Sequence, residues 1–176
     1  MTMNMEKKYL YIIHQIFEMN KNRNNLGKKM FQKLFYLIEQ KGVSLNLNYI
    51  IHFYGPYSSK LDALIHEFES ENYLNINTSG MTHIINETSD FPKNSTDISD
   101  EDKNMIDEVL KKFLSKTPRD LEALTTIDYV AKHIQEDMRN ENNIIKDVIK
   151  IKGDKFSEDQ LKLYYSELKA ASYINI

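Results

Sequence analysis

The sequence contains no cysteine and no tryptophan, and it has only five glycines and three prolines among its 176 residues. The absence of cysteine excludes disulfides, thiol nucleophiles and cysteine-based zinc sites. Arginine is also scarce, since Arg23, Arg119 and Arg139 are the only three, so few positions can read guanine or phosphate with a guanidinium fork. The net charge of −3 gives no general attraction to nucleic acid.

Long apolar runs are missing as well. No stretch approaches the roughly 20 apolar residues that a membrane helix needs. The N-terminal apolar run is interrupted by His14, Gln15 and Glu18 and lacks a small-residue cleavage site. We therefore expect a cytoplasmic protein without a membrane partner. With 41% hydrophobic and 28% charged residues, the chain can bury a core as one domain or as two small lobes.

The N-terminal half combines helical periodicity with one β-rich segment. Apolar spacing predicts helices over about residues 6–19 and 26–41, then a strand over 48–54 that ends at Gly55-Pro56. A third helix starts at Ser58 or Ser59 and reaches about residue 72, and Ser59 with Asp62 fits a capping box. Alternating residues around Ser79-Gly80 predict a hairpin whose tight turn has Gly80 at positive φ.

The C-terminal half is predicted to be helical. Helices are expected over about residues 100–114, 118–137, 141–151 and 158–171, with capping signals at Ser99, Thr117 with Asp120, and Ser157 with Gln160. The predicted fold class is α+β, mostly α. A winged-helix-like lobe spans residues 1–88, and its strand can join the hairpin in a small antiparallel sheet. A linker over 89–98 leads to a four-helix bundle over 99–176, packed on the first lobe.

Two groups of polar residues are candidates for binding sites. Asp62 and His66 lie one helical turn apart, the spacing at which two ligands face one metal ion, and His52 is a third weak candidate; a solvated pair is the alternative. Lys21, Arg23, Lys28, Lys29 and Lys33 form a basic cluster without an acid between them, which suits nucleic acid or an acidic partner, or else a solvated helix start. The predicted third helix is itself acidic, which argues against placing it in the major groove of DNA.

Catalytic signals are absent from the sequence patterns. There is no HExxH, no phosphate-binding glycine motif and no nucleophile motif, so we predict no catalytic residue and no cofactor. Tyrosines are the remaining feature. Tyr54, Tyr57 and Tyr73 are expected either to pack half-buried or to form a protein-binding face.

Residues 28–76 carry a resemblance to known families. A Lys-Leu pair in a helix, a strand ending in Tyr-Gly-Pro-Tyr-Ser and an amphipathic helix before a hairpin resemble the YwgA-like bacterial proteins and, more distantly, the Panacea-domain antitoxins related to SocA. The segment "KFSEDQLKLYYSEL" is similar to a Lys-Phe-Ser-acidic segment near the end of YwgA-like chains. The resemblance implies a helix-turn-helix-like core and a noncatalytic role, either in binding a toxin or as an adaptor to a protease.

The leading prediction is therefore a noncatalytic protein–protein interaction module, either antitoxin-like or a defence- or phage-related regulator. Its partner is expected to be another protein, such as a toxin, a protease or a defence component. The alternative is a winged-helix-like DNA-binding transcription regulator that uses the basic cluster and the Gly80 hairpin tip. A metal-dependent enzyme comes third. Homodimer formation through the C-terminal helices is left open.

Overall fold

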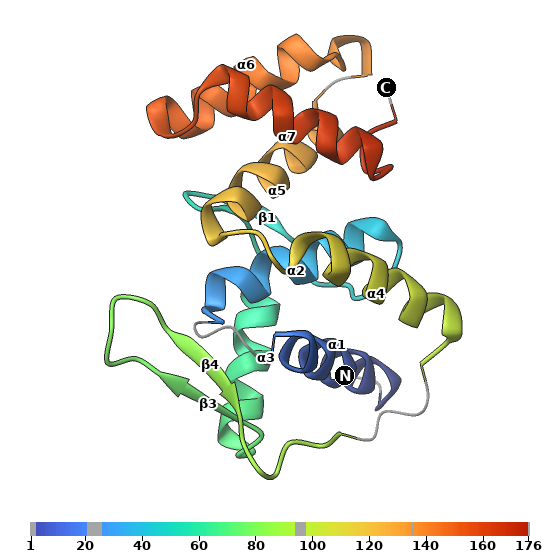
Figure 1. Ribbon diagram of the computed structural model, residues 1–176, viewed down its shortest axis with the longest axis vertical. Helices are drawn as coiled ribbons and strands as arrows, with labels where there is room; N and C mark the ends of the chain where they lie inside the picture. The colour runs from blue at the N-terminus through green and yellow to red at the C-terminus, as the bar shows by residue number, and fades with distance from the viewer. Residues whose placement is uncertain (1–2, 21–25, 94–97, 135, 176) are drawn as a thin grey trace. The chain divides into compact units, whose positions relative to one another are not determined.

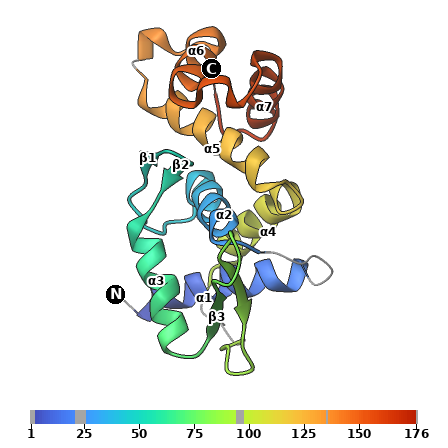
Figure 2. The same cartoon turned by 90° about the vertical axis from the view of Figure 1, so that its left-hand side faces the viewer.

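The computed structural model describes residues 3–20, 26–93, 98–134 and 136–175, and this part of the chain contains seven α-helices and four short strands. The predicted α+β, mostly α class is confirmed. The residues group into two compact units (Figures 1 and 2). Unit 1 is drawn from Met1–Asn48 and Ser58–Ser115, and unit 2 from Tyr49–Tyr57 and Lys116–Ile176.

Unit 1 is built around a helix that is buried on all sides. This helix, α2 (Lys28–Lys41), has no exposed residue from Met30 to Ile38. Around it lie α1 (Met3–Met19), α3 (Ser59–Ser70) and α4 (Asp100–Phe113). Gly42 ends α2 at φ +127, a backbone conformation that residues other than glycine rarely adopt. The predicted end of this helix at Gly42 is therefore confirmed.

The predicted hairpin of unit 1 is formed by β3 (Leu74–Asn77) and β4 (Ile84–Glu87), which pair in antiparallel register with Ile76 opposite Ile85. Its connection is longer than predicted, because the strands stop at residue 77 and resume at 84. Gly80 does not adopt a positive φ, so the expected tight turn around it is wrong.

The segment around Gly55-Pro56 also differs from prediction. The strand reverses at Phe53-Tyr54, so β1 (Ile50–His52) pairs with β2 (Gly55–Tyr57) in a sheet of its own, and the expected sheet with β3 and β4 does not form. Gly55 allows the reversal with φ +85. Pro56 lies opposite Ile51. Proline has no N–H to donate to a neighbouring strand, and it is tolerated here because both strands of a two-stranded ribbon are edge strands.

Unit 2 has its own central helix, α5 (Pro118–His133), which is buried continuously from Leu121 to Asp128. It packs against β2, α6 (Glu141–Lys152) and α7 (Glu158–Ala170). Two short 3-10 helices, η1 (Glu136–Met138) and η2 (Gly153–Lys155), flank α6.

The helix starts of unit 2 follow the sequence signals. Both predicted capping boxes, Thr117 with Asp120 and Ser157 with Gln160, are present. The capping box of α5 also contacts α7, where the Tyr164 hydroxyl donates a hydrogen bond to Asp120 at 2.6 Å. Burial and this bond to a carboxylate raise the pKa of Tyr164 to about 12.

The two units divide the chain differently from the predicted boundaries at 88 and 99. Helix α4 belongs to unit 1, where Lys8 pairs with Asp102 at 2.7 Å and Lys41 with Glu108 at 2.8 Å. The β1–β2 hairpin belongs to unit 2, because β2 packs on α5. Residues 94–97 of the predicted linker lie outside the described residues. The predicted division into a lobe over 1–88, a linker over 89–98 and a lobe over 99–176 packed on the first stays a prediction.

Candidate protein-binding site

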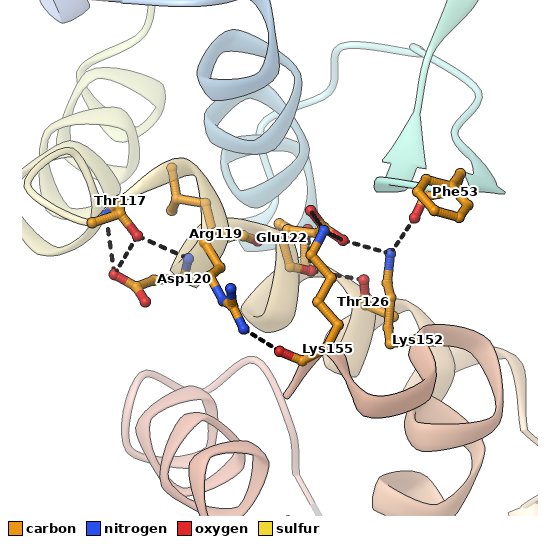
Figure 3. A network of polar contacts seen from close by, with 10 residues as sticks. Phe53, Thr117, Arg119, Asp120, Glu122, Thr126, Lys152 and Lys155 are labelled. Carbon is orange, nitrogen blue, oxygen red and sulfur yellow. Dashed lines mark hydrogen bonds and ion pairs between the residues drawn. The ribbon is translucent and has the colours of Figure 1, made fainter. Parts of the chain in front are cut away.

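A buried ion network occupies the middle of unit 2 (Figure 3). Glu122 on α5 has a side chain only 4% exposed, and it accepts from two lysines. Lys152, at the end of α6 and 2% exposed, lies 2.9 Å from Oε1; Lys155, in η2, lies 2.7 Å from both carboxylate oxygens. The network thus joins α5 to the α6–η2 corner.

The same network reaches the β1–β2 turn. The Lys152 ammonium donates to the main-chain carbonyl of Phe53 at 2.7 Å, so one buried cation bridges Glu122 and the turn (Figure 3). Arg119, in the first turn of α5, donates to the main-chain carbonyl of Lys155. The 3-10 helix η2 is therefore held to α5 through both the main chain and the ammonium group of Lys155. The backbone of the turn is therefore anchored from inside the unit.

The charge state of Glu122 follows from its partners. Burial disfavours its ionised form, but the hydrogen bonds and positive charges of Lys155 and Lys152 outweigh this effect and hold the pKa of Glu122 below its ordinary value. A carboxylate removed from water is stable only when paired and hydrogen-bonded in this way. Glu122 is therefore an ionised structural anchor.

The side chains of the anchored turn point outward. Phe53 is 74% exposed and Tyr54 is 43% exposed, and their rings meet edge to face with centroids 4.9 Å apart. The Lys155 ammonium lies 5.3 Å from the centroid of the Tyr54 ring, within the range of a cation–π contact. We call Phe53 and Tyr54 the aromatic turn.

An open groove of about 300 Å³ lies in the same unit. Its wall is mainly apolar and aromatic, formed by Ile51, Tyr129, Val130, Ile134 and Ile151, and its polar residues are His133, Asp147 and Lys150. The His133 ring stacks on Tyr129 at 3.9 Å, and its Nδ1 donates to the Tyr129 carbonyl at 2.7 Å. Asp147 and Lys150 pair with each other at 2.6 Å.

The three predicted tyrosines do not form one cluster within a single unit. Tyr54 and Tyr57 belong to unit 2, where the Tyr57 ring lies 5.7 Å from that of His52. Tyr73 belongs to unit 1, packs beside Phe68 at 6.2 Å and is only partly exposed. Of the three, Tyr54 has the greatest exposure, and a partner-binding role for each stays a prediction.

The weak metal candidates are also divided between the units. His52 is in unit 2, whereas Asp62 and His66 are on α3 of unit 1. Lys28 lies 3.0 Å from Asp62 Oδ1 and 2.7 Å from His66 Nε2, so an ammonium already bridges the two side chains. Within the described ranges, no group of three or more histidines and acids is arranged to hold a metal ion.

The basic cluster has three members in the described part of the chain. Lys29 is exposed, Lys28 is paired with Asp62, and Lys33 is only 3% exposed. Lys21 and Arg23 lie outside the described residues. Nucleic-acid binding stays a prediction, and the burial of Lys33 removes one cation from any surface there.

Sequence reasoning missed Phe53, Glu122, Lys152 and Lys155. Phe53 is the fifth residue of "YIIHFY", which reads as a strand with packed side chains, so its exposure carries no sequence signal. Glu122 interrupts the apolar run "LEALTTI", and a lone acid in a buried helix is the one available signal of a charged partner.

The family follows from a comparison with known protein families. Residues 31–128, more than half of the chain, match the model of the antitoxin SocA-like, Panacea domain. The chain belongs to this family, which confirms the predicted resemblance to Panacea antitoxins; the resemblance to YwgA-like proteins stays a prediction. The match runs from α2 of unit 1 to α5 of unit 2 and includes the aromatic turn and Glu122. A comparison with curated proteins found no match.

None of the helices in the described residues is both long and apolar enough to traverse a bilayer.

Proposed function

We propose that this chain is a noncatalytic, antitoxin-like protein of the cytoplasm that acts by binding another protein, and that the aromatic turn makes the contact. The observation that carries the proposal is the 74% exposure of Phe53 on a turn whose backbone is held by Lys152. Aromatic residues are enriched at protein interfaces and carry much of their binding energy. A turn fixed before binding also costs less to order in the complex.

The partner should offer an apolar pocket. The hairpin segment Tyr49–Tyr57 contains no acidic residue, lysine or arginine, and the neighbouring Lys155 is already paired with Glu122, so charge contributes little to recognition there. Phe53 is the natural anchor, with Tyr54 at its edge. Membership of the Panacea family supports a toxin as the partner class, while a protease or another defence component is the alternative.

Site-specific photo-crosslinking tests the proposal. A photoreactive phenylalanine analogue is placed at Phe53 and, as a matched control, at Leu163, which is 71% exposed on α7 of the same unit. In cells of the source organism, we expect a discrete adduct with another protein from position 53 and none from position 163. Mass spectrometry then identifies the partner.

Co-expression completes the test. The wild-type chain should relieve growth inhibition by the captured protein, and Phe53→Ser should not, because it removes the anchor without touching the core. Equal capture at both positions, or full protection by Phe53→Ser, would contradict the proposed role of the turn.

A further inference from the structure

We propose that the partner adds an extended segment of its own chain to β1, with main-chain hydrogen bonds along the outer edge of the β1–β2 hairpin. The inference rests on the proposed function and deepens it, because it states which structure the partner brings to this chain. That structure is a strand, and not a helix.

The outer side of β1 is an open strand edge. Within the described residues, β1 pairs with β2 and with no other strand. All three of its residues, Ile50, Ile51 and His52, are exposed, and Ile50 is 61% exposed. In an antiparallel pair, the N–H and C=O groups of alternate residues point away from the partner strand. The outer edge of β1 therefore presents main-chain donors and acceptors that a further strand can bond.

The other three strands have protected edges. Beside β4, the main-chain N–H of Ile85 donates to the Leu26 carbonyl at 2.9 Å. Beside β3, the main-chain N–H of Ile76 donates to the Glu69 carboxylate at 3.2 Å. Strand β2 carries Pro56 and packs on α5. Proteins protect edge strands by such cover, by charged residues, by proline or by short length. In the described part of the chain, β1 has only its short length.

The open edge selects an extended segment as its occupant. Another strand supplies matching main-chain donors and acceptors, whereas the main chain of a helix is already bonded within the helix. Strand β1 also leads directly into Phe53, so a partner that receives this side chain lies next to β1 as well. This continuity is why we assign the added strand to the partner of the aromatic turn.

The alternation of side chains indicates the sequence of the added segment. Ile51 lines the apolar groove of unit 2, whereas its neighbours Ile50 and His52 point to the other face of the strand. A residue of the added strand on the Ile51 side therefore lies on the groove side, where an apolar side chain is favoured. The hairpin has no acid, lysine or arginine to pair with a charge. We expect a segment that is apolar at every second position and carries no charge toward the hairpin.

Photo-crosslinking from β1 tests the inference. The photoreactive phenylalanine analogue is placed at Ile50 and at His52 of the full-length chain, with Leu163 again as the control position. In cells of the source organism, we expect both β1 positions to link to one continuous segment of the partner. The two linked residues should lie about two places apart, as in paired strands.

The linked segment, synthesised as a peptide, then distinguishes a strand from any other contact. Methylation of one amide nitrogen removes one main-chain donor. In an added strand the amides point alternately toward β1 and away from it. Methylation at alternate positions should therefore weaken binding to the wild-type chain about tenfold or more, and methylation at the positions between them should leave it unchanged. Fluorescence anisotropy of the labelled peptides measures the binding.

Failure of this inference differs from failure of the proposed function. Adducts from position 53, with scattered or absent adducts from 50 and 52, would overturn the added strand and leave the aromatic turn as the contact. A peptide series without alternation would also overturn it, as would adducts that join two copies of this chain. Adducts from 50 and 52 without one from 53 would support the added strand and contradict the anchoring role of Phe53.

Discussion

Glu122 is the residue on which the ion network of unit 2 depends. In Glu122→Gln, the ammonium groups of Lys152 and Lys155 lose the carboxylate that both contact. Removing one partner of a buried pair typically costs several kcal/mol, and we expect a loss of about 3 kcal/mol because the Phe53 carbonyl still accepts from Lys152. Urea unfolding at pH 7 measures the change.

The control for this substitution is Asp147→Asn, which breaks a pair whose lysine is 76% exposed. Exposed pairs contribute roughly 0–1 kcal/mol, so the unfolding midpoint should move little. If both variants were destabilised equally, burial would not be the reason that Glu122 matters.

The pH dependence of stability provides a second measurement on Glu122. Because its folded-state pKa lies below the ordinary value, the unfolded chain binds the proton more readily. Its contribution is therefore complete above the unfolded pKa of about 4.3 and is lost as the pH falls through the folded value. We expect the difference between wild type and Glu122→Gln in urea unfolding to shrink steadily below about pH 4.3. A difference that stays constant to pH 3 would contradict the assigned shift.

At the scale of the element, Ser58 joins three segments of unit 1. Its Oγ donates to the Leu47 carbonyl at 2.5 Å and accepts from Leu61 at the start of α3, while Gln32 on α2 exchanges two 2.9 Å bonds with its main chain. Ser58 is fully buried, whereas Ser59 is exposed. The cap of α3 is thus Ser58, and the predicted Ser59–Asp62 capping box is wrong.

These contacts give a matched pair of variants. Ser58→Ala loses a helix cap and a buried hydrogen bond, so we expect it to destabilise the chain by about 2 kcal/mol. Ser59→Ala should stay within about 0.5 kcal/mol of wild type, as surface substitutions do. Chemical unfolding of both compares them directly, and similar losses at the two positions would refute the assignment of the cap.

The elements that could be predicted are those with local signals. Each of the capping boxes that begin at Thr117 and Ser157 is contained in four consecutive residues, so the starts of α5 and α7 can be predicted directly from the sequence. The sequence predicts that α5 ends at about residue 137, but the helix ends at His133, where no glycine or proline marks its end. The reversal at Phe53-Tyr54 was missed because two aromatic residues give no turn signal.

The candidate site was less predictable than the helices. Tyr54 could be selected because it adjoins a Gly-Pro pair, but Glu122 and Lys152 lie 30 residues apart. Their pairing depends on α5 being buried on all sides, which follows from tertiary packing. Propensity and periodicity describe single elements, so they cannot report which buried charges meet.

At the scale of the whole molecule, the two units are interleaved along the chain. Because the β1–β2 hairpin packs on α5, fragment 116–176 lacks part of its own unit, whereas fragment 1–115 contains all of unit 1. We expect 1–115 to unfold cooperatively and 116–176 to be poorly structured when the circular dichroism of each is followed in urea.

Joining residues 49–57 to 116–176 through a glycine–serine linker should restore a cooperative transition, because it returns β2 to α5 and the Phe53 carbonyl to Lys152. A fragment 116–176 that folds equally well without the hairpin would show that the hairpin is dispensable to unit 2.

The interleaving also affects how genes of this family can be exchanged. A crossover just after codon 115 would take the hairpin from one parent and α5, α6 and α7 from the other. The resulting chimera would keep an intact unit 1 but join an aromatic turn to a foreign lysine anchor. Functional hybrids should therefore inherit residues 49–57 and 116–176 from the same parent, although the two segments are far apart in the gene.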